Sequence, residues 1–409
     1  MSTMKNFVGW IDDRFPMTKV WNEHLAQYYA PKNFNFWYFM GSLALLVLVN
    51  QILTGVWLAM SYKPDATLAF GSVEYIMRDV DWGWLIRYMH STGASAFFIV
   101  IYLHMFRGLM YGSYRKPREL LWIIGVIIYL AMMATAFFGY LLPWGQMSYW
   151  GAQVIVNLFS AVPVIGPDLG VWVRGDYVIS DATLNRFFAL HFLLPFLLAA
   201  LVFIHIVALH KVGSNNPDGI EIKKNKDENG IPKDGIPFHP YYTVKDIAGV
   251  AGFLFLFAAV IFYAPEMGGY FLEHPNFEPA NPLKTPPHIA PVWYFTPFYA
   301  ILRAVPSMMG SAFPGVVAMF ASILIMFFLP WLDRSPVKSI RYKGMITKIM
   351  LGLFVIDFIM LGYLGTQPTT ALYKALAQIG TIYYFAFFLL MPIYSKLDKT
   401  KPVPERVTE

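Results

Sequence analysis

The chain has 409 residues, of which 57% are hydrophobic and only 14% are charged, and its net charge is +6. A soluble domain is closer to half apolar with about a quarter of its residues charged, so this composition indicates a protein that crosses a membrane several times. The sequence contains no cysteine, which excludes disulfides, thiolate metal sites, iron–sulfur ligation and covalent haem attachment by this chain.

Several stretches are apolar enough, over about 20 residues, to cross a bilayer as helices. The eight candidates are 36–61, 85–108, 119–141, 185–210, 247–265, 308–331, 346–364 and 374–394. The expected fold is therefore an all-α polytopic membrane protein with eight transmembrane helices. Asp357 lies inside the seventh span, where it either lines a helix interface or marks an interfacial end.

The basic residues predict the orientation of these spans. If the N-terminus is inside, the inner segments 1–33, 107–118, 211–245, 333–348 and 396–409 hold 23 of the 31 Lys and Arg residues. This bias follows the positive-inside rule and predicts that both termini are cytoplasmic. Basic loops that face anionic lipid also explain the net positive charge without nucleic acid. The N-terminal residues lack an apolar core followed by a cleavage site, so no removable signal peptide is expected.

The loops predict the domain organisation. Residues 142–184 mix apolar and amide side chains and are expected to form amphipathic helices on the outer membrane surface. Residues 265–297 contain eight prolines, which predicts a stiff, non-helical outer loop. The polar inner loop 213–246 divides the chain into an N-terminal four-helix bundle, residues 1–212, and a C-terminal four-helix membrane domain, residues 247–409.

Two apolar segments begin and end with histidine at the same spacing. One runs from His90 to His104 and the other from His191 to His205. The two histidines of each segment fall only about 40° from full register, so they share one helix face, and they are roughly 21 Å apart along the axis. Both spans run from the outer to the inner side. His90 and His191 are therefore expected near the outer face, and His104 and His205 near the inner face.

Three interpretations of these histidines remain open. Each imidazole could hydrogen-bond a neighbouring helix, or the four could relay protons, although roughly 21 Å is long for a relay. A haem suits two facing imidazoles, because the porphyrin supplies four equatorial nitrogens and the pair supplies the axial ligands. The matched spacing favours the third interpretation. In it, the first four-helix bundle holds two stacked bis-histidine haems, which provide an electron path across the membrane.

Glycine and arginine support the haem interpretation. Glycines recur at the same 14-residue interval in the first and third spans, at Gly41 and Gly55 and at Gly125 and Gly139. Glycine permits the close approach of a macrocycle, although helix packing in membranes also uses it. Arg87 and Arg107 flank His90 and His104 by three residues, where they could pair with haem propionates. Ordinary positive flanking explains an arginine at the inner end but not at the outer end.

Longer motifs resemble a known family. The chain is similar to the cytochrome b subunit of quinol–cytochrome c oxidoreductase, respiratory complex III, in the two histidine segments and in FFGYLLPWGQMSYWGA (137–152), LHKVGSNNP (209–217), FHPYYTVKD (238–246) and NPLKTPPHIAPVWYFTPFYAILRAVP (281–306). The resemblance covers residues 35–306 and continues beyond about residue 310 only in hydropathy and helix count. The unsplit chain and equal histidine spacings favour the respiratory type over the photosynthetic relative, and the charged insert at 220–235 favours the bacterial over the mitochondrial type.

The resemblance implies a Q-cycle with proton translocation. Two non-covalent b-type haems would be bound, a low-potential one by His90 and His191 and a high-potential one by His104 and His205. Ubiquinol or another quinol would be oxidised near the outer face, with one electron passing to a mobile Rieske iron–sulfur protein and the other to the haems. Quinone would be reduced near the inner face. A membrane-anchored c-type cytochrome subunit, a homodimer of the complex and the bacterial inner membrane are further implications.

The resemblance also assigns residues to two quinone sites. The outer, quinol-oxidising site would be walled by Tyr140, Pro143, Gly151, Ala152, Pro291, Val292, Trp293, Tyr294 and Tyr299. Without the motifs, these aromatic residues would be interpreted as an interfacial belt. The inner, quinone-reducing site would contain His210, Ser214, Phe238 and Asp246. The alternatives are that His210 is a solvent-facing helix end and that Asp246 pairs with Lys245 or another lysine of the inner loop.

One position departs from the family pattern. The familiar motif is Pro-Glu-Trp-Tyr, and its glutamate is usually assigned as a proton acceptor, whereas this chain has valine at position 292. Valine cannot accept a proton. Glu266, in the same outer loop, is the first candidate to replace that glutamate, and Glu273 and Glu278 are further candidates. A histidine ligand of the iron–sulfur partner is another possible acceptor.

Two other classes of function compete with this interpretation. One is a di-haem membrane anchor that exchanges electrons between quinone and a soluble dehydrogenase, which would leave the proline-rich loop unexplained. The other is a transporter with histidine proton relays, which would bind no chromophore and would leave the glycine spacing unexplained.

Overall fold

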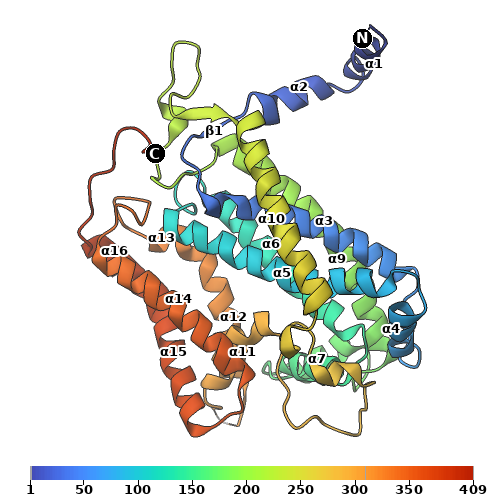
Figure 1. Cartoon of the computed structure of the whole chain (residues 1–409). Helices are drawn as coiled ribbons and strands as arrows, with labels where there is room; N and C mark the ends of the chain where they lie inside the picture. The colour runs from blue at the N-terminus through green and yellow to red at the C-terminus, as the bar shows by residue number, and fades with distance from the viewer. Residues whose placement is uncertain (1, 309, 409) are drawn as a thin grey trace.

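The computed structural model describes residues 2–308 and 310–408, and helices make up most of it (Figure 1). Eight helical stretches in the described residues are long and apolar enough to cross a membrane: Phe36–Ala59, Gly83–Tyr111, Glu119–Leu141, Asp181–Val212, Phe238–Tyr263, Phe313–Leu332, Met345–Thr366 and Ala371–Leu389. Each falls on one of the predicted spans, which confirms the all-α membrane fold. Residue 309, inside the sixth predicted span, lies outside the described residues.

The first four spans form two antiparallel helix pairs. Helix α3 (Met40–Ala59), which follows the short η2 (Phe36–Phe39), packs along α5 (Gly83–Tyr111), and α6 (Glu119–Leu141) packs along α9 (Asp181–Val212). Within α5, the buried side chains include small or polar ones, among them Thr92, Ser95 and Ala96. Small residues let membrane helices approach closely, so the sequence itself permits this tight pairing.

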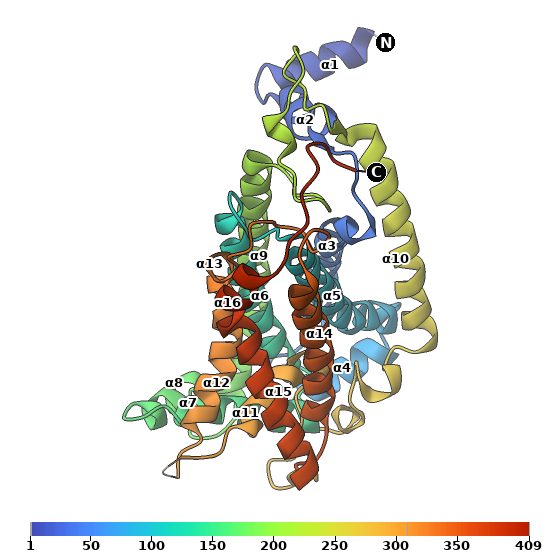
Figure 2. The same ribbon diagram turned by 90° about the vertical axis from the view of Figure 1, so that its left-hand side faces the viewer.

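The next span does not join the last three. Helix α10 (Thr243–Tyr263) packs against α3 and α5 of the first half, and in Figure 2 it stands apart from the C-terminal helices. The C-terminal group consists of α11 (Thr296–Ala304), α12 (Phe313–Leu324), η8 (Ile325–Phe328), α13 (Leu329–Leu332), α14 (Met345–Thr366), α15 (Ala371–Leu389) and α16 (Met391–Leu397). Helix α11 is the centre of this group, because it contacts α12, α14 and α15.

Asp357 lies at the interface between α14 and α15. Asp357 is only 6% exposed, and a Cβ atom placed on Gly380 of α15 would lie 2.7 Å from Asp357 Oδ1. The helices can approach this closely only because position 380 has no side chain. Of the two roles open from the sequence, Asp357 therefore has the first, lining a helix interface.

Short helices cover the end of the bundle opposite to the chain termini (Figures 1 and 2). The helices expected in residues 142–184 are present as α7 (Gln146–Ser160) and α8 (Gly166–Arg174). Helix α4 (Ala69–Arg78) joins them at this end and was not expected from the sequence. Before α11 begins at Thr296, the proline-rich segment 265–297 forms only the short 3-10 turns η5 (Met267–Gly269), η6 (His274–Phe277) and η7 (Trp293–Phe295), as its composition predicted.

The opposite end holds the inner loop and both chain ends. It contains α1 (Ser2–Asp12), α2 (Met17–Trp21), η1 (Asn22–Ala26), η3 (Ile222–Lys224) and η4 (Phe238–Tyr242). Strand β1 (Tyr29–Pro31) pairs antiparallel with β2 (Gly235–Pro237), so the N-terminal segment is fixed against the residues that lead into α10. Because eight spans bring both ends to one side, this arrangement agrees with the even span count.

Ion pairs hold the inner loop in place. Glu221 accepts hydrogen bonds from Arg118 Nη1 at 2.6 Å and from Lys338 Nζ at 2.5 Å. Asp333 accepts from Lys343 at 2.6 Å, and Lys343 is only 4% exposed. These contacts join the α5–α6 connection, the inner loop and the segment before α14, so the loop that separates the two halves in sequence is anchored to both of them.

Candidate haem and quinone sites

The four histidines lie in two layers, and each faces a glycine of the partner helix in its pair. A Cβ atom on Gly55 of α3 would lie 3.2 Å from His90 Cε1, and one on Gly41 would lie 3.6 Å from His104 Cε1. In the second pair, a Cβ atom on Gly125 of α6 would lie 3.4 Å from His205 Cε1, and Gly139 takes the same position opposite His191. The matched intervals in the sequence therefore correspond to matched contacts in space.

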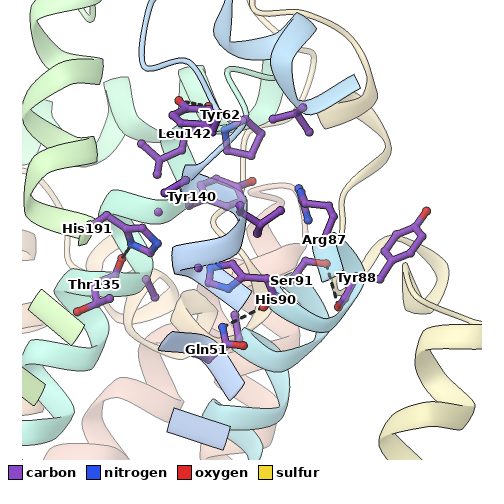
Figure 3. A pocket seen from close by; sticks show the side chains of 18 of the residues that line it. Gln51, Tyr62, Arg87, Tyr88, His90, Ser91, Thr135, Tyr140, Leu142 and His191 are labelled. Atoms are coloured by element: carbon purple, nitrogen blue, oxygen red, sulfur yellow. Dashed lines mark hydrogen bonds between the residues drawn. The ribbon is translucent and has the colours of Figure 1, made fainter. Parts of the chain in front are cut away.

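The outer layer brings two imidazoles into opposition. The ring centres of His90 and His191 are 6.1 Å apart, and the ring planes are nearly perpendicular at 85°. Figure 3 shows both side chains reaching from different helices into one pocket, with Tyr140 and Arg87 beside them. Metal–nitrogen bonds of about 2 Å, with each ring centre about 1 Å beyond its nitrogen, would set two ring centres roughly 6 Å apart. The spacing fits one iron between the rings.

Hydrogen bonds at Nδ1 leave Nε2 of both outer histidines available. His191 Nδ1 lies 2.8 Å from the carbonyl oxygen of Thr135, so this nitrogen carries the proton and donates it. His90 Nδ1 lies 2.9 Å from Thr54 Oγ1, whose own hydroxyl donates to the Asn50 carbonyl at 2.6 Å. Thr54 therefore accepts from His90. A proton fixed on Nδ1 makes Nε2 the free electron-pair donor, which is how metal-binding histidines are commonly oriented.

The inner layer is formed by His104 of α5 and His205 of α9, close to Arg107. The Arg107 Nη2 atom lies 3.4 Å from His104 Nδ1, and the guanidinium group stacks over Tyr38 with 4.9 Å between its carbon and the ring centre. Arg107 Nε is shielded from solvent and has no hydrogen-bond partner among the described residues. A buried guanidinium with an unused donor is suited to an anionic group that enters this layer.

Three observations support the fit of one haem between the two histidines of each layer. Two imidazoles converge in the outer layer, and both layers place one histidine on α5 and one on α9. Each imidazole has a glycine behind it, where a larger side chain would push the ring toward the centre of the bundle. Arg87 and Arg107 are absent from the ion pairs of the described residues, so the two arginines remain available for propionates. Among the described residues, no group of three or more His, Asp or Glu side chains is placed to hold a metal ion without a cofactor.

A cavity of about 450 Å³ lies at the layer formed by His90 and His191. His90, His191, Gly55 and Gly139 line one part of it, and Arg87 lies at its side. The cavity continues to a second set of lining residues, Tyr140, Pro143, Phe271, Leu272, Asn276, Val292 and Tyr294. One continuous space therefore joins the outer histidine layer to the aromatic pocket expected to take quinol.

The predicted outer-site residues divide into lining and supporting ones. Four line the cavity: Tyr140, Pro143, Val292 and Tyr294. Trp293 lies behind the wall, where its Nε1 donates to Ser95 Oγ at 3.0 Å. Gly151 packs against the Tyr140 ring, and Ala152 is buried in the cluster around α7. Pro291 and Tyr299 are outside the lining; the Tyr299 ring instead stacks under Arg303 at 4.6 Å.

The three candidate carboxylates of the outer loop occupy different environments. Glu266 Oε2 lies 3.9 Å from His274 Nδ1, and its side chain is 36% exposed. Glu278 is exposed. Glu273 is different, because its Oε1 atom is shielded from solvent without a hydrogen-bond partner, and Asn276 Nδ2 donates to its Oε2 at 3.2 Å. Burial raises the pKa of the Glu273 carboxyl to about 7, which hydrogen bonds to the carboxylate offset only in part.

The inner site is organised by Tyr28, a residue that the sequence analysis did not single out. Its ring centre lies 4.7 Å from that of His210 and 6.3 Å from that of Phe238. Its hydroxyl lies 3.0 Å from Ser214 Oγ. Tyr28 is placed there because the Phe238 amide donates to the Tyr28 carbonyl at 2.8 Å, next to the pairing of β1 with β2. Three of the four predicted inner-site residues thus surround one tyrosine.

Asp246 lies at the start of α10 and contacts the first span. Its Oδ2 atom accepts a hydrogen bond from Ser42 Oγ at 2.9 Å. Lys245 instead lies over the Tyr242 ring at 5.2 Å, so the alternative pairing of Asp246 with Lys245 is not what the structure contains. Ser42 follows Gly41, which faces His104, and this contact places Asp246 near the inner histidine layer.

Comparisons with known proteins agree with this architecture. The family model described as Cytochrome b/b6/petB matches residues 25–213, and the model Cytochrome b(C-terminal)/b6/petD matches residues 279–385. The chain is 76% identical over 405 residues to cytochrome b of Allochromatium vinosum, with 98% of both chains covered. It is 46% identical to cytochrome b of Rhodobacter capsulatus, covering 98% of this chain and 94% of that one.

A solved structure gives the same result. The chain is 41% identical to a chain of a hyperthermophilic respiratory complex III, with a TM-score of 0.87 and coverage of 95% of this chain and 98% of that chain. The resemblance first noted in the histidine segments and the loop motifs therefore extends over nearly the whole length, including the C-terminal helices. The chain belongs to the cytochrome b family.

Proposed function

We propose that the chain is the di-haem electron-transfer core of a quinol–cytochrome c reductase. The observation that carries the proposal is the arrangement of two histidine layers, each backed by glycines, with the outer layer open to an aromatic cavity. His90 and His191 would hold the outer haem, and His104 and His205 the inner one. When bound, the two haems would supply one-electron carriers at two depths of the membrane.

The outer cavity is the proposed site of quinol oxidation. Its walls are mainly aromatic and aliphatic, which suits a flat, apolar ring, and Tyr140 contributes a polar group at one side. Tyr294 is held rigidly, because its ring stacks on Phe98 at 3.8 Å between ring centres and its carbonyl accepts from Tyr102 at 2.6 Å. A rigid wall fixes the distance between the bound ring and the histidine layer.

The inner site is the proposed place of quinone reduction. Tyr28, His210, Ser214 and Asp246 offer hydroxyl, imidazole and carboxyl groups near the inner face, which are the groups that hydrogen-bond a quinone carbonyl and deliver protons. Phe238 adds an apolar ring contact. Two quinone sites on opposite sides of the membrane are the requirement for a Q-cycle that translocates protons.

The proposed function requires partners for the electrons that leave the outer cavity. We propose a Rieske iron–sulfur protein and a membrane-anchored c-type cytochrome, in a homodimeric complex of the bacterial inner membrane. A curated relative from Bradyrhizobium diazoefficiens, named cytochrome b/c1, supports the second partner. The two proteins are 50% identical over an alignment that includes 98% of this chain and 56% of the relative. Cytochrome c1 and cytochrome b are thus joined in one polypeptide in that organism.

The test is electron transfer from quinol in the purified complex that contains the chain. We expect quinol to reduce both the bound haem and added cytochrome c, and an inhibitor that competes for the inner site to block haem reoxidation. The rival function, a membrane anchor of a soluble dehydrogenase, predicts a different result. Haem that is reduced by a dehydrogenase substrate, with no quinol-dependent reduction of cytochrome c, would contradict the proposal.

A further inference from the structure

We propose that Glu273 is the proton acceptor for quinol at the outer cavity, and thus a catalytic residue of the oxidation step. The inference rests on the proposed function and names the group that removes the substrate's proton. It starts from a missing proton acceptor in the cavity wall. Val292 forms part of this wall and is 3% exposed, and it has no atom that can accept a proton.

Glu273 is held beside the cavity by a rigid contact between η6 and α7. The Ser148 amide donates to Asn276 Oδ1 at 2.7 Å, and a Cβ atom on Gly145 would lie 2.7 Å from the same oxygen. Glycine at position 145 therefore lets the turn approach the helix. The fixed Asn276 then donates through Nδ2 to both Tyr140 Oη and Glu273 Oε2, each at 3.2 Å. One amide thus joins Glu273 to a hydroxyl that lines the cavity.

The second oxygen of Glu273 is the reactive feature. Oε1 is shielded from solvent and accepts no hydrogen bond of good geometry from the described residues. A buried acceptor without a donor is costly, unless a ligand supplies the donor. Leu272 and Asn276, on either side of Glu273, line the cavity together with Tyr140. A quinol hydroxyl that enters beside Tyr140 would provide the missing donor.

The electrostatic surroundings favour a carboxyl group that exchanges protons near neutral pH. The titratable groups that face Glu273 are Tyr140 of α6 and Tyr294 of η7, and neither is charged at neutral pH. The described residues place no lysine, arginine or histidine in an ion pair with it. Burial outweighs the hydrogen bonds to the carboxylate and raises the pKa of Glu273 to about 7. A base with a pKa near the working pH is the most effective kind.

The other acceptors around the cavity are already engaged. Glu74, which lines the far part, forms an ion pair with Arg78 at 2.5 Å. His90 and His191 have their Nδ1 atoms hydrogen-bonded, and their Nε2 atoms face the proposed iron. Glu266 is more exposed and lies 3.9 Å from His274. Glu273 remains as the carboxyl group with a buried, unused oxygen next to the aromatic part of the cavity.

Only a proton moves in the proposed step. The quinol O–H bond breaks, a carboxyl O–H bond forms on Glu273 Oε1, and the substrate becomes a quinolate anion. Its electrons then go to the one-electron acceptors of the complex, an iron–sulfur protein and haem. The next residue, His274, is exposed and lies near Glu266. These two groups offer the proton a way from Glu273 to the outer solution.

The experiment measures single-turnover haem reduction by quinol in the purified complex, with the inner site inhibited, from about pH 5 to about pH 9. In the unmodified complex the rate should rise as pH passes about 7, because only the deprotonated carboxyl accepts a proton. Glu273→Gln should lower the rate roughly 100-fold or more and abolish the rise. Glu278→Gln, the matched control at an exposed position of the same loop, should keep both. Haem content reports that each variant assembles.

Two further measurements separate a catalytic role from a structural one. The double variant Glu273→Gln with Val292→Glu places a carboxyl group on the cavity wall and should recover part of the rate and a pH-dependent limb. Infrared spectra should contain a protonated-carboxyl band that titrates near pH 7 and is missing in Glu273→Gln. An unchanged rate and pH profile in Glu273→Gln, with normal quinol-driven reduction in the unmodified complex, would overturn this inference alone. Absence of quinol-driven reduction in the unmodified complex would overturn the proposed function as well.

Discussion

At four positions in the helix bundle, the absence of one side chain decides where an imidazole can lie. Gly55 and Gly139 stand opposite the outer histidines, and Gly41 and Gly125 stand opposite the inner ones. A methyl group at any of these positions would meet the ring edge at or below ordinary contact distance. Because a ligand must be held within a fraction of an ångström of its productive position, we expect the glycines to be as necessary to the proposed haem layers as the histidines.

Gly139→Val tests this relationship. The added side chain would overlap the His191 ring and turn it away from His90, so the outer haem should be lost while the inner haem remains. The matched control is Gly252→Val on α10, where a Cβ atom meets nothing within 4 Å. The measurement is the ratio of haem to protein in the purified complex, read from the reduced absorbance spectrum. Retention of both haems in Gly139→Val would show that the contact does not position the ligand.

At the scale of elements, the sequence predicted what depends on local periodicity and failed where distant segments meet. The eight spans, the shared faces of the histidines and the helices at 142–184 follow from hydropathy and helix geometry. The packing of α10 on α3 and α5 could not be predicted, because all the spans have similar apolar surfaces.

The sites show the same division. The four histidines that form the two layers, and the four predicted outer-site residues that line the cavity, were singled out from spacing and motifs. Tyr28 was missed because only the pairing of β1 with β2 brings it to His210. From the sequence, Glu273 was a weaker candidate for the proton acceptor than Glu266. The burial of a loop carboxyl depends on the contact of η6 with α7, which composition does not reveal.

The buried ion-pair network at the inner end predicts a specific loss of stability. Glu221→Gln would leave Arg118, which is 2% exposed, without its carboxylate partner, and should lower the free energy of unfolding by about 3 kcal/mol. Against the opposing effect of burial, Arg118 and Lys338 hold the pKa of Glu221 below its ordinary value. This contribution is therefore present at neutral pH and is lost as the pH falls through the lowered pKa.

Thermal unfolding of the purified complex measures the effect of Glu221→Gln. The control is Glu23→Gln, which removes an exposed pair with Lys19 whose atoms are 3.8 Å apart. An exposed pair of this kind contributes at most about 1 kcal/mol, so the control should unfold close to the unmodified complex. Equal shifts in the two variants would contradict a special role for the buried network.

At the scale of the whole molecule, the fold separates two chemical sites by the length of the histidine helices. The aromatic cavity is lined in part by residues of α4, whereas Tyr28 directly precedes β1, and Figure 1 shows α4 and β1 toward opposite ends of the bundle. Helices α5 and α9 run between these ends, and each carries one histidine of either layer. The arrangement connects the two sites through the proposed haems.

The most direct test of this account is a reduced-minus-oxidised absorbance spectrum of the purified chain, with haem quantified per polypeptide. We expect two b-type haems, with His90→Ala losing the outer one and His205→Ala losing the inner one, because each substitution removes an axial ligand from a different layer. A chain without haem, or with a single haem that survives both substitutions, would contradict the two-layer arrangement and the function proposed from it.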